Sequence, residues 1–233
     1  MDARRAAVLR VLGVERLERR AATAGTAGTR AVVPAGLAPA DDTATPLLDW
    51  EGLARAVAAC TRCALHATRT QTVFGVGDRA AQWLVVGEAP GADEDRKGEP
   101  FVGRAGQLLN SMLCAVGLAR ERVYIANVLK CRPPANRDPT PVETRCCLPY
   151  LHRQVALLRP RIILCVGRIA AQNLLGVDTP LARLRGQVHA LAPLGTPVVV
   201  TYHPAYLLRS PGEKRKAWAD LEFALEVAHG RRA

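Results

Sequence analysis

Four of the seven cysteines are spaced so that they could close a metal site. Cys60 and Cys63 form a C-x-x-C pair, while Cys131 and Cys147 lie far along the chain. Two neighbouring thiolates and two distant ones can complete a cage around zinc or bind an iron–sulfur cluster, and the spacing alone does not choose between these metals. Cys146 is adjacent to Cys147 and is an alternative fourth ligand.

The segment 87–106 has the composition of a ligand-binding loop. It follows an apolar run at 83–86, typical of a buried strand, and precedes a stretch with apolar residues at helical spacing. Open α/β sheets bind ligands where a strand passes into a helix. The segment is rich in glycines, which let backbone N–H groups approach a ligand, and in carboxylates. It also holds Phe101, whose ring could stack on a flat ligand.

Two further polar residues follow apolar runs. Asn127 carries a carboxamide, whose one acceptor and two donor hydrogens can read the edge of a pyrimidine ring, although a strand-end cap is an equally good explanation. His203 comes directly before Pro204 at the end of another predicted strand, which makes it a catalytic candidate.

The pattern of apolar residues indicates which elements position these groups. It predicts buried strands at 84–86, 123–126, 162–166 and 198–201, and helices at 49–59, 104–116, 140–158, 168–175 and 213–229. Because strands alternate with helices, we predict a three-layer α/β/α fold around a central four-stranded parallel sheet. The carboxyl ends of parallel strands meet at one edge, so the polar residues after them should form one site.

The chain divides into an N-terminal extension, 1–45, and a domain, 46–233. Residues 3–20 have the pattern of a basic amphipathic helix, with disorder as the alternative, and 21–45 have the composition of a flexible linker. No apolar stretch approaches the roughly 20 residues that cross a membrane, and the first residues do not resemble a signal peptide. These observations predict a cytoplasmic protein, and as separate expectations we take it to be monomeric and associated with the nucleoid.

The net charge of +11 belongs mainly to the domain. Of the 32 basic and 21 acidic residues, 25 and 16 lie after residue 45, which leaves this part at +9. A basic domain attracts polyanions and favours nucleic acid as a partner, although arginine-rich usage can also reflect genome composition. An odd number of cysteines argues against a disulfide scaffold.

In combination, the motifs resemble those of family-four uracil-DNA glycosylases, the iron–sulfur branch of that superfamily. The resemblance covers about 60–218. The matching segments are VFGVG at 73–77, GEAPG at 87–91, GEPFVG at 98–103, NVLKCRPP at 127–134 and HPAYLLR at 203–209. The resemblance implies a [4Fe–4S] cluster on Cys60, Cys63, Cys131 and Cys147. Position 147 is chosen because the Pro-Tyr-Leu that follows it matches the family.

The resemblance also implies a reaction: a deoxyuridine is flipped out of DNA and its N-glycosidic bond is hydrolysed, which releases uracil and leaves an abasic site. Phe101 would stack on the uracil ring and Asn127 would pair with its O4 and N3 edge. His203 would donate to O2 as negative charge develops on the leaving base.

Other residues of the same motifs would complete the pocket. Glu88 and the backbone at Ala89 would line it and hold the water, while Glu94 would crowd the position of a thymine methyl group. Asn136 is a second candidate for positioning the water, and no residue is an obvious general base.

DNA contacts are expected around the pocket. Lys130, Arg132 and Arg137 would contact phosphates. Leu207, Leu208 and Arg209 would fill the gap left by the flipped nucleotide, unless the leucines pack inward at the start of a helix. Two other functions remain open from the sequence: a non-catalytic iron–sulfur DNA-binding module of a repair or replication assembly, and a zinc-dependent α/β hydrolase.

Overall fold

A six-stranded sheet forms the centre of the molecule, in a computed structural model that describes residues 45–232. The strands are β1 (Val76–Gly77), β2 (Trp83–Gly87), β3 (Tyr124–Asn127), β4 (Ile162–Val166), β5 (His189–Leu191) and β6 (Thr196–Thr201), in the spatial order β1-β3-β2-β4-β6-β5. The inner four strands are parallel, as predicted. The edge strands β1 and β5 pair antiparallel with their neighbours. The sheet is therefore larger than the four-stranded sheet expected from the sequence.

The two edge strands lack the pattern that reveals the inner four. Every residue of β2, β3 and β4 is buried, as in parallel strands covered on both faces. By contrast, β1 has only two residues, neither fully buried, and β5 has three. Segments this short form no apolar run that stands out from a loop.

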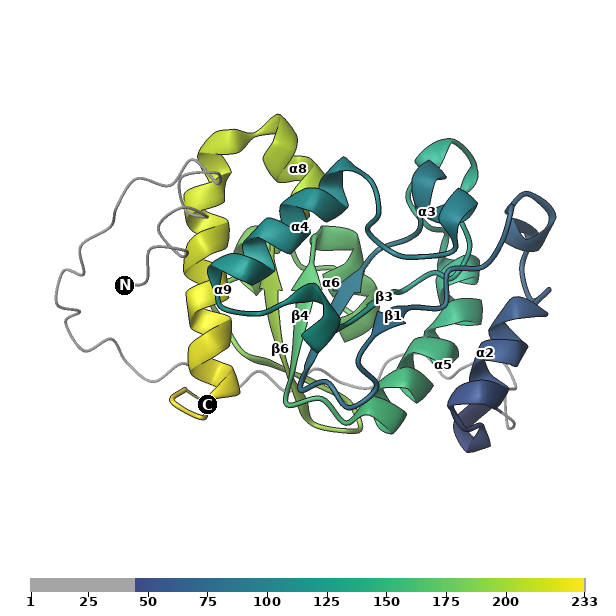
Figure 1. Cartoon of the computed structure of the whole chain (residues 1–233), viewed down its shortest axis with the longest axis horizontal. Coiled ribbons are helices and arrows are strands. Elements are labelled where there is room, and N and C mark those ends of the chain that lie inside the picture. Colours follow the sequence, from purple (N-terminus) through teal and green to yellow (C-terminus); the bar gives the residue numbers. More distant parts are fainter. Residues whose placement is uncertain (1–44, 233) are drawn as a thin grey trace, which may run out of the picture.

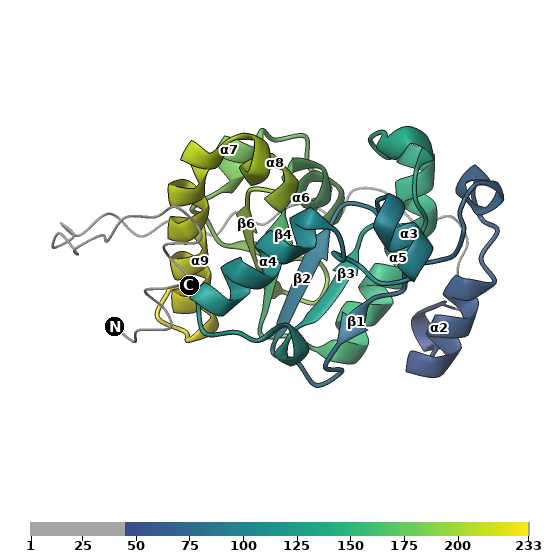
Figure 2. The same ribbon diagram turned by 45° about the horizontal axis from the view of Figure 1, so that its top comes forward.

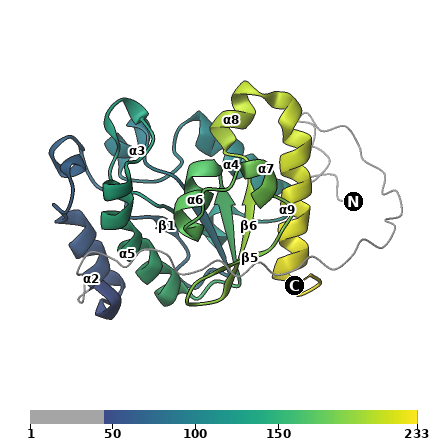
Figure 3. The same ribbon diagram turned by 180° about the vertical axis from the view of Figure 1, so that it is seen from behind.

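Helices cover both faces of the sheet. They are α2 (Trp50–Ala58), α3 (Ala92–Lys97), α4 (Arg104–Ala115), α5 (Pro141–Leu158), α6 (Arg168–Leu175), α7 (Leu181–Leu184), α8 (Pro204–Arg209) and α9 (Lys214–Ala228). Short 3-10 turns include η1 (Thr45–Leu47), η2 (Ala64–Ala67), η3 (Arg120–Arg122), η4 (Pro134–Asn136) and η5 (Pro211–Glu213). In Figure 1, α4 and α9 lie in front of the sheet, and in Figure 3 α5 and α6 lie in front of the opposite face.

Alternating strand residues supply two separate cores. Val85, Ile125 and Leu164 point to the face covered by α4 and α9. Their neighbours Val86 and Ala126 belong to the core under α5 and α6. A smaller cluster joins α2 to α5. This arrangement confirms the predicted three-layer α/β/α fold.

The carboxyl ends of the parallel strands, with α3 and α8 beyond them, lie at one end of the sheet (Figure 2). The predicted basic helix and linker of the N-terminal extension lie outside the described residues, apart from Thr45 in η1. In the part of the chain that the structure describes, no helix is both long and apolar enough to span a membrane.

Candidate active site and cysteine pocket

The ends of β2 and β3 bring an aromatic ring and an amide together. Gly87 and Asn127 are partners across the two strands. A Cβ atom on Gly87 would lie 2.4 Å from Oδ1 of Asn127 and 2.6 Å from Cζ of Phe101. Any side chain at position 87 would therefore collide with both groups. The glycine is what allows the Phe101 ring and the Asn127 amide to share this space.

The Asn127 amide is buried and unsatisfied. The side chain belongs to a residue only 1% exposed, and within the described residues neither Nδ2 nor Oδ1 has a hydrogen-bond partner. Buried polar atoms are nearly always paired, so two orphaned atoms on one amide indicate a ligand that supplies the partners. That ligand must offer an acceptor to Nδ2 and a donor to Oδ1.

The backbone at Phe101 is held in an unusual conformation. Its φ is 55°, in the left-handed region that residues other than glycine seldom adopt. Arg120 donates to the carbonyl of Pro100 at 2.6 Å. One carboxylate oxygen of Glu94 accepts from the backbone N–H groups of Val102 and Gly103, at 2.9 and 3.2 Å. These contacts fix the ring in the pocket at some cost in backbone strain.

Glu94 is therefore fully engaged with the loop. Its second carboxylate oxygen accepts from the N–H of Gly91 at 3.1 Å, which caps the start of α3. The carboxylate thus ties three backbone N–H groups of the 91–103 loop together. Its contacts are with the protein backbone, and it acts on the pocket through the position of Phe101.

His203 caps α8 and faces Phe101. Its Nδ1 accepts from the N–H of Ala205 at 3.1 Å, which assigns the ring proton to Nε2. The His203 and Phe101 ring centroids are 5.7 Å apart. Burial lowers the pKa of His203 to about 4; the positive charge of Arg209 lowers it further and Glu94 opposes this. The imidazole is therefore a neutral hydrogen-bond donor at physiological pH.

Glu88 is a half-buried carboxylate directly after β2. Burial raises its pKa to about 7, the negative charge of Asp138 adds to this, and the positive charge of Arg168 opposes it. A carboxylate poised near neutrality can accept a proton in this pH range. The adjacent Ala89 is half-buried and packs against the core under α5 and α6.

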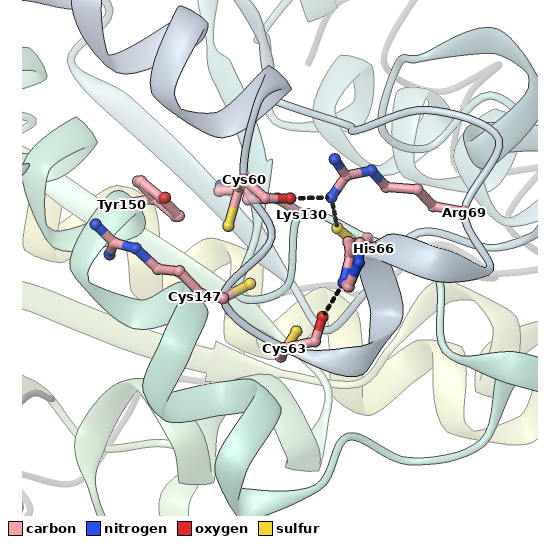
Figure 4. A pocket seen from close by; sticks show the side chains of 9 residues that line it. Cys60, Cys63, His66, Arg69, Lys130, Cys147 and Tyr150 are labelled. Atoms are coloured by element: carbon pink, nitrogen blue, oxygen red, sulfur yellow. Dashed lines mark hydrogen bonds between the residues drawn. The ribbon is translucent and has the colours of Figure 1, made fainter.

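The four predicted cysteines line one pocket, shown in Figure 4. Cys60 and Cys63 come from the loop after α2, Cys131 from the loop after β3, and Cys147 from α5. Cys146 does not line this pocket: its thiol lies 3.3 Å from the carbonyl of Arg62 and donates to it. Of the two candidates for the fourth position, Cys147 is therefore the one that lines the pocket.

Positive groups surround the thiols. Arg69 donates from Nη1 to Sγ of Cys131 at 3.1 Å and to the carbonyl of Cys60 at 2.8 Å. Burial raises the pKa of Cys131, and that of Cys147 to about 12. Lys130 also lines the pocket; burial lowers its pKa to about 7, and the Cys147 and Cys131 sulfurs oppose this.

These side chains fit a metal centre that is held by thiolates and that, together with those thiolates, carries a net negative charge. Burial raises the pKa values of three of these thiols, Cys63, Cys131 and Cys147, and beside an arginine and a lysine the thiols can become thiolates once a cationic metal centre binds them. Among the described residues, no three His, Cys, Asp or Glu side chains converge closely enough to hold a single metal ion.

Two predicted DNA contacts are wrong. Lys130 is 1% exposed, and its ammonium donates to protein oxygens, so it cannot reach a phosphate. Leu207 is also 1% exposed and packs in the core beside α4, which confirms the inward-packing alternative. Both errors arise because sequence reasoning judged each residue from its neighbours in the chain, whereas its burial depends on segments far away.

The remaining predicted contacts lie at or near the surface. Leu208 and Arg209 are exposed on α8. Asn136 is exposed on η4, and its amide oxygen accepts from Nε of Arg132 at 2.8 Å. Both outer nitrogens of Arg137 donate to the carboxylate of Glu143, at 2.9 and 2.6 Å. The structure thus brings Glu88, Phe101, Asn127 and His203 to one end of the sheet but leaves Asn136 outside their contacts.

Several residues around the site were missed. Arg120, Gln154 and Arg69 support the site through contacts with Pro100, Lys130 and Cys131, which lie 20, 24 and 62 residues away in the chain. No local signal in the sequence could have found them. Tyr206 was also missed: it is 38% exposed beside Leu208 and stacks on Tyr202, with ring centroids 5.2 Å apart. An exposed aromatic residue one turn after His203 is the signal that was available.

Comparison with known proteins identifies relatives over most of the chain. The uracil DNA glycosylase superfamily matches residues 74–222. The type-4 uracil-DNA glycosylase of Archaeoglobus fulgidus is 48% identical over 178 residues, which cover 74% of this chain and 89% of the relative. Those of Pyrobaculum aerophilum and Thermotoga maritima are 41% and 43% identical, and cover 75% and 71% of this chain and 92% and 87% of the relatives.

Proposed function

This chain belongs to the type-4 branch of the uracil-DNA glycosylase superfamily, and from that premise we propose that it excises uracil from DNA as a monofunctional repair enzyme. The observation that carries the proposal is the unsatisfied, buried amide of Asn127 beside the Phe101 ring. A flat heterocycle with a donor next to an acceptor on its edge would satisfy that amide. Uracil offers this pair in its N3–H and O4.

Recognition of the base follows from the direction of these hydrogen bonds. Nδ2 of Asn127 would donate to O4 of uracil, and Oδ1 would accept from N3–H. Cytosine has an acceptor at N3 and a donor at C4, so both contacts would become repulsive. Phe101 would stack on the ring after the nucleotide has been flipped out of the helix. Glu94 would exclude thymine indirectly, by holding the Phe101 loop close to the C5 edge of the base.

Bond cleavage would leave negative charge on the base. The C1′–N1 bond breaks, and its electron pair stays on uracil, where it is shared with O2. The Nε2–H of His203 would donate to O2 and stabilise that charge. A neutral imidazole suits this role because Nδ1 is already committed to the N–H of Ala205. Water then adds to C1′ of the sugar and loses a proton.

Glu88 is the group we assign to that water. Its pKa of about 7 lets the carboxylate accept the proton in part of the protein population at neutral pH. Asn136 remains a weaker candidate, since it is exposed and its amide oxygen is held by Arg132. A sugar cation captures water readily, so a weak base is sufficient here.

The four cysteines would hold a [4Fe–4S] cluster. When bound, the cluster supplies iron–thiolate cross-links, which would join the loop after α2 to the loop after β3 and to α5. We propose a structural role for it, because the pocket lies beside the strand end that carries Asn127. Strong absorbance at about 400 nm in the purified protein would distinguish iron from zinc.

The DNA would lie against α8 and the η4 region. Tyr206, Leu208 and Arg209 are exposed within two turns of His203, where they could contact the strand that carries the flipped nucleotide. Arg132 and Arg137 would contact phosphates while keeping their present partners. We propose uracil-containing DNA as the partner and a monomer as the working form.

Excision from a labelled oligonucleotide with one deoxyuridine tests the function. Alkali treatment reveals abasic sites, and wild type is compared with His203→Ala and Asn127→Ala. Loss of a donor to a developing anion costs about 10²–10³-fold in rate, so both variants should fall sharply. His229→Ala is the matched control, since His229 is exposed at the end of α9.

The alternative outcome is equally informative. If iron-loaded wild type leaves the oligonucleotide intact but binds DNA in a salt-dependent manner, the protein is a non-catalytic DNA-binding module. If the protein contains zinc and no iron, the cluster proposal fails even where excision is observed.

A further inference from the structure

Lys130 is a buried lysine whose hydrogen bonds are all used. Its Nζ lies 2.9 Å from the carbonyl of Asn127, 2.7 Å from Oε1 of Gln154 and 3.3 Å from the carbonyl of Phe74. An ammonium group has three donor hydrogens and no acceptor, so three oxygen partners match the charged form. All three oxygens belong to neutral groups. The charge itself is therefore not balanced by these contacts.

Lys130 also takes part in the cysteine pocket. Lys130 lines it together with the four cysteines, and Cys131 is its direct neighbour in the chain. Transfer of an ammonium group from water into a protein interior costs several kcal/mol unless an opposite charge offsets it. Thiolates bound to a metal centre would provide that negative charge at this position.

The contact with Asn127 lies where β3 leaves the sheet. Val128 and Leu129 donate to the carbonyls of Gly87 and Glu88, so these strand ends are already tied together. Lys130 adds a bond to the carbonyl of Asn127 itself. Gln154 of α5 orients the ammonium group and also donates to the carbonyl of Phe74 at 2.9 Å. The position of the Asn127 backbone thus depends on the side chain of a residue that lines the cysteine pocket.

We propose that Lys130 is a positioning residue that couples the two sites: its ammonium balances the negative charge of the cysteine-ligated group on one side and fixes the carbonyl of Asn127 on the other. The inference rests on the proposed function, since it requires both the cluster in the cysteine pocket and the recognition of uracil by the Asn127 amide. It adds a role for a residue that is neither a proposed base contact nor a proposed ligand of the metal centre.

The test uses the full-length, iron-loaded protein and Lys130→Met, which keeps most of the length of the side chain and removes its charge and donors. Loss of iron is followed at about 400 nm in the presence of a ferrous chelator. Binding of free uracil is measured as inhibition of excision. Removal of a group that supports a metal site typically costs 10–100-fold, so we expect roughly tenfold faster iron loss and similarly weaker inhibition by uracil.

Two further variants make the result decisive. Lys214→Met is the matched control, since Lys214 is a partly exposed lysine at the start of α9, and it should leave both quantities unchanged. Gln154→Met keeps the ammonium group but removes one of its acceptors, and it should change both quantities by a smaller factor. This second variant carries the test if Lys130→Met does not fold.

The outcomes separate this inference from the proposed function. Suppose that wild type retains iron and excises uracil, and that the Lys130 and Gln154 variants retain iron and bind uracil as well as wild type does. In that case only the inference is wrong. A change in one quantity without the other also contradicts the coupling. Wild type without iron or excision activity would instead overturn the proposed function itself.

Discussion

Glu88 and His203 show how one environment sets two protonation states. Burial disfavours the charged form of any side chain, so it raises the pKa of a carboxyl group and lowers that of an imidazole. Accordingly, the pKa of Glu88 rises to about 7 and that of His203 falls to about 4. At neutral pH the histidine is uncharged and can only donate through Nε2, while the carboxyl group is partly ionised. The two residues are thus suited to act on the base and on the water, respectively.

The pH dependence of excision should report on Glu88. If its carboxylate accepts the proton of the water, kcat/KM should rise with pH and level off above about pH 7. Asp138→Asn removes a negative charge that raises this pKa, so the inflection should move to lower pH. Arg168→Gln removes a positive charge that lowers it, so the inflection should move to higher pH. The measurement is a kcat/KM profile for the three proteins between about pH 5 and pH 9.

Glu88→Gln completes that experiment, because it should lower the rate and abolish the inflection. A profile that keeps its inflection in Glu88→Gln, or that does not shift in the two charge variants, would assign the titration to another group.

A single methyl group at position 87 should close the pocket. In Gly87→Ala the new Cβ would lie 2.4 Å from the Asn127 amide and 2.6 Å from the Phe101 ring, so these groups must move apart. We expect a folded protein whose kcat/KM for uracil excision falls by at least about 100-fold, comparable to the loss of a catalytic donor. Gly212→Ala is the control, since a Cβ there meets open space. Wild-type activity in Gly87→Ala would show that uracil binds elsewhere.

At the scale of elements, a buried ion pair joins Arg185, directly after α7, to Asp220 of α9, and the end of β6 is bound to the same carboxylate. Arg185 donates to both carboxylate oxygens of Asp220, at 2.7 and 3.0 Å, and Thr201 at the end of β6 donates to the same carboxylate at 2.7 Å. Arg185 also lies over the ring of Tyr202, the residue directly before His203. Burial raises the pKa of Asp220, although Arg185 and Thr201 oppose this, so the carboxylate depends on its partners to remain charged.

Breaking this pair should destabilise the protein more than breaking a surface pair. Asp220→Ala leaves the largely buried Arg185 guanidinium without its carboxylate, and such losses cost about 3–5 kcal/mol in the free energy of unfolding. Arg96→Ala removes an exposed pair with Asp93 and should cost less than about 1 kcal/mol. Denaturant unfolding of the two variants tests the difference. Equal losses would mean that Asp220 contributes little to holding the end of β6.

Most elements could be predicted because their signals are local. The four inner strands are continuous apolar runs, and α5 begins with a capping box at Thr140 and Glu143 that also has a proline at the first helical position. What the sequence could not show depends on contacts between distant segments. Lys130 is buried because Gln154, on another element, meets its ammonium group. Likewise, the strained conformation of Phe101 depends on Glu94 and Arg120, and no pattern of apolar residues in the sequence links these two residues to Phe101.

The same reasoning applies to the candidate site. The residue types in the motifs and their positions after strands were enough to propose Glu88, Phe101, Asn127 and His203 as candidates. Chain order alone, however, could not distinguish Cys147 from Cys146, because the two differ in which way α5 turns their side chains. It also could not show which leucine of α8 faces solvent, since this depends on the packing of the short helix against α4.

For the whole molecule, the distribution of charge determines what should bind DNA. The chain carries +11, and residues 1–44 contain 7 of the 32 basic and 5 of the 21 acidic residues, so their share is only +2. The remaining +9 is in the part that also carries the candidate site. Phosphate contacts release counterions, so each one makes the affinity for DNA fall more steeply with salt.

Deletion of residues 1–44 should therefore leave excision and its salt dependence almost unchanged. We expect kcat/KM on a short deoxyuridine oligonucleotide to stay within about threefold of the value for the full chain. The slope of log KM against log salt concentration should change by less than the amount that about one phosphate contact contributes. The control is Arg209→Gln in the full chain, which should reduce that slope by roughly one contact because Arg209 is exposed on α8. If the truncated protein instead loses most of its activity or of its salt dependence, the extension must supply the principal contacts with DNA. The contacts proposed for α8 would then be secondary to it.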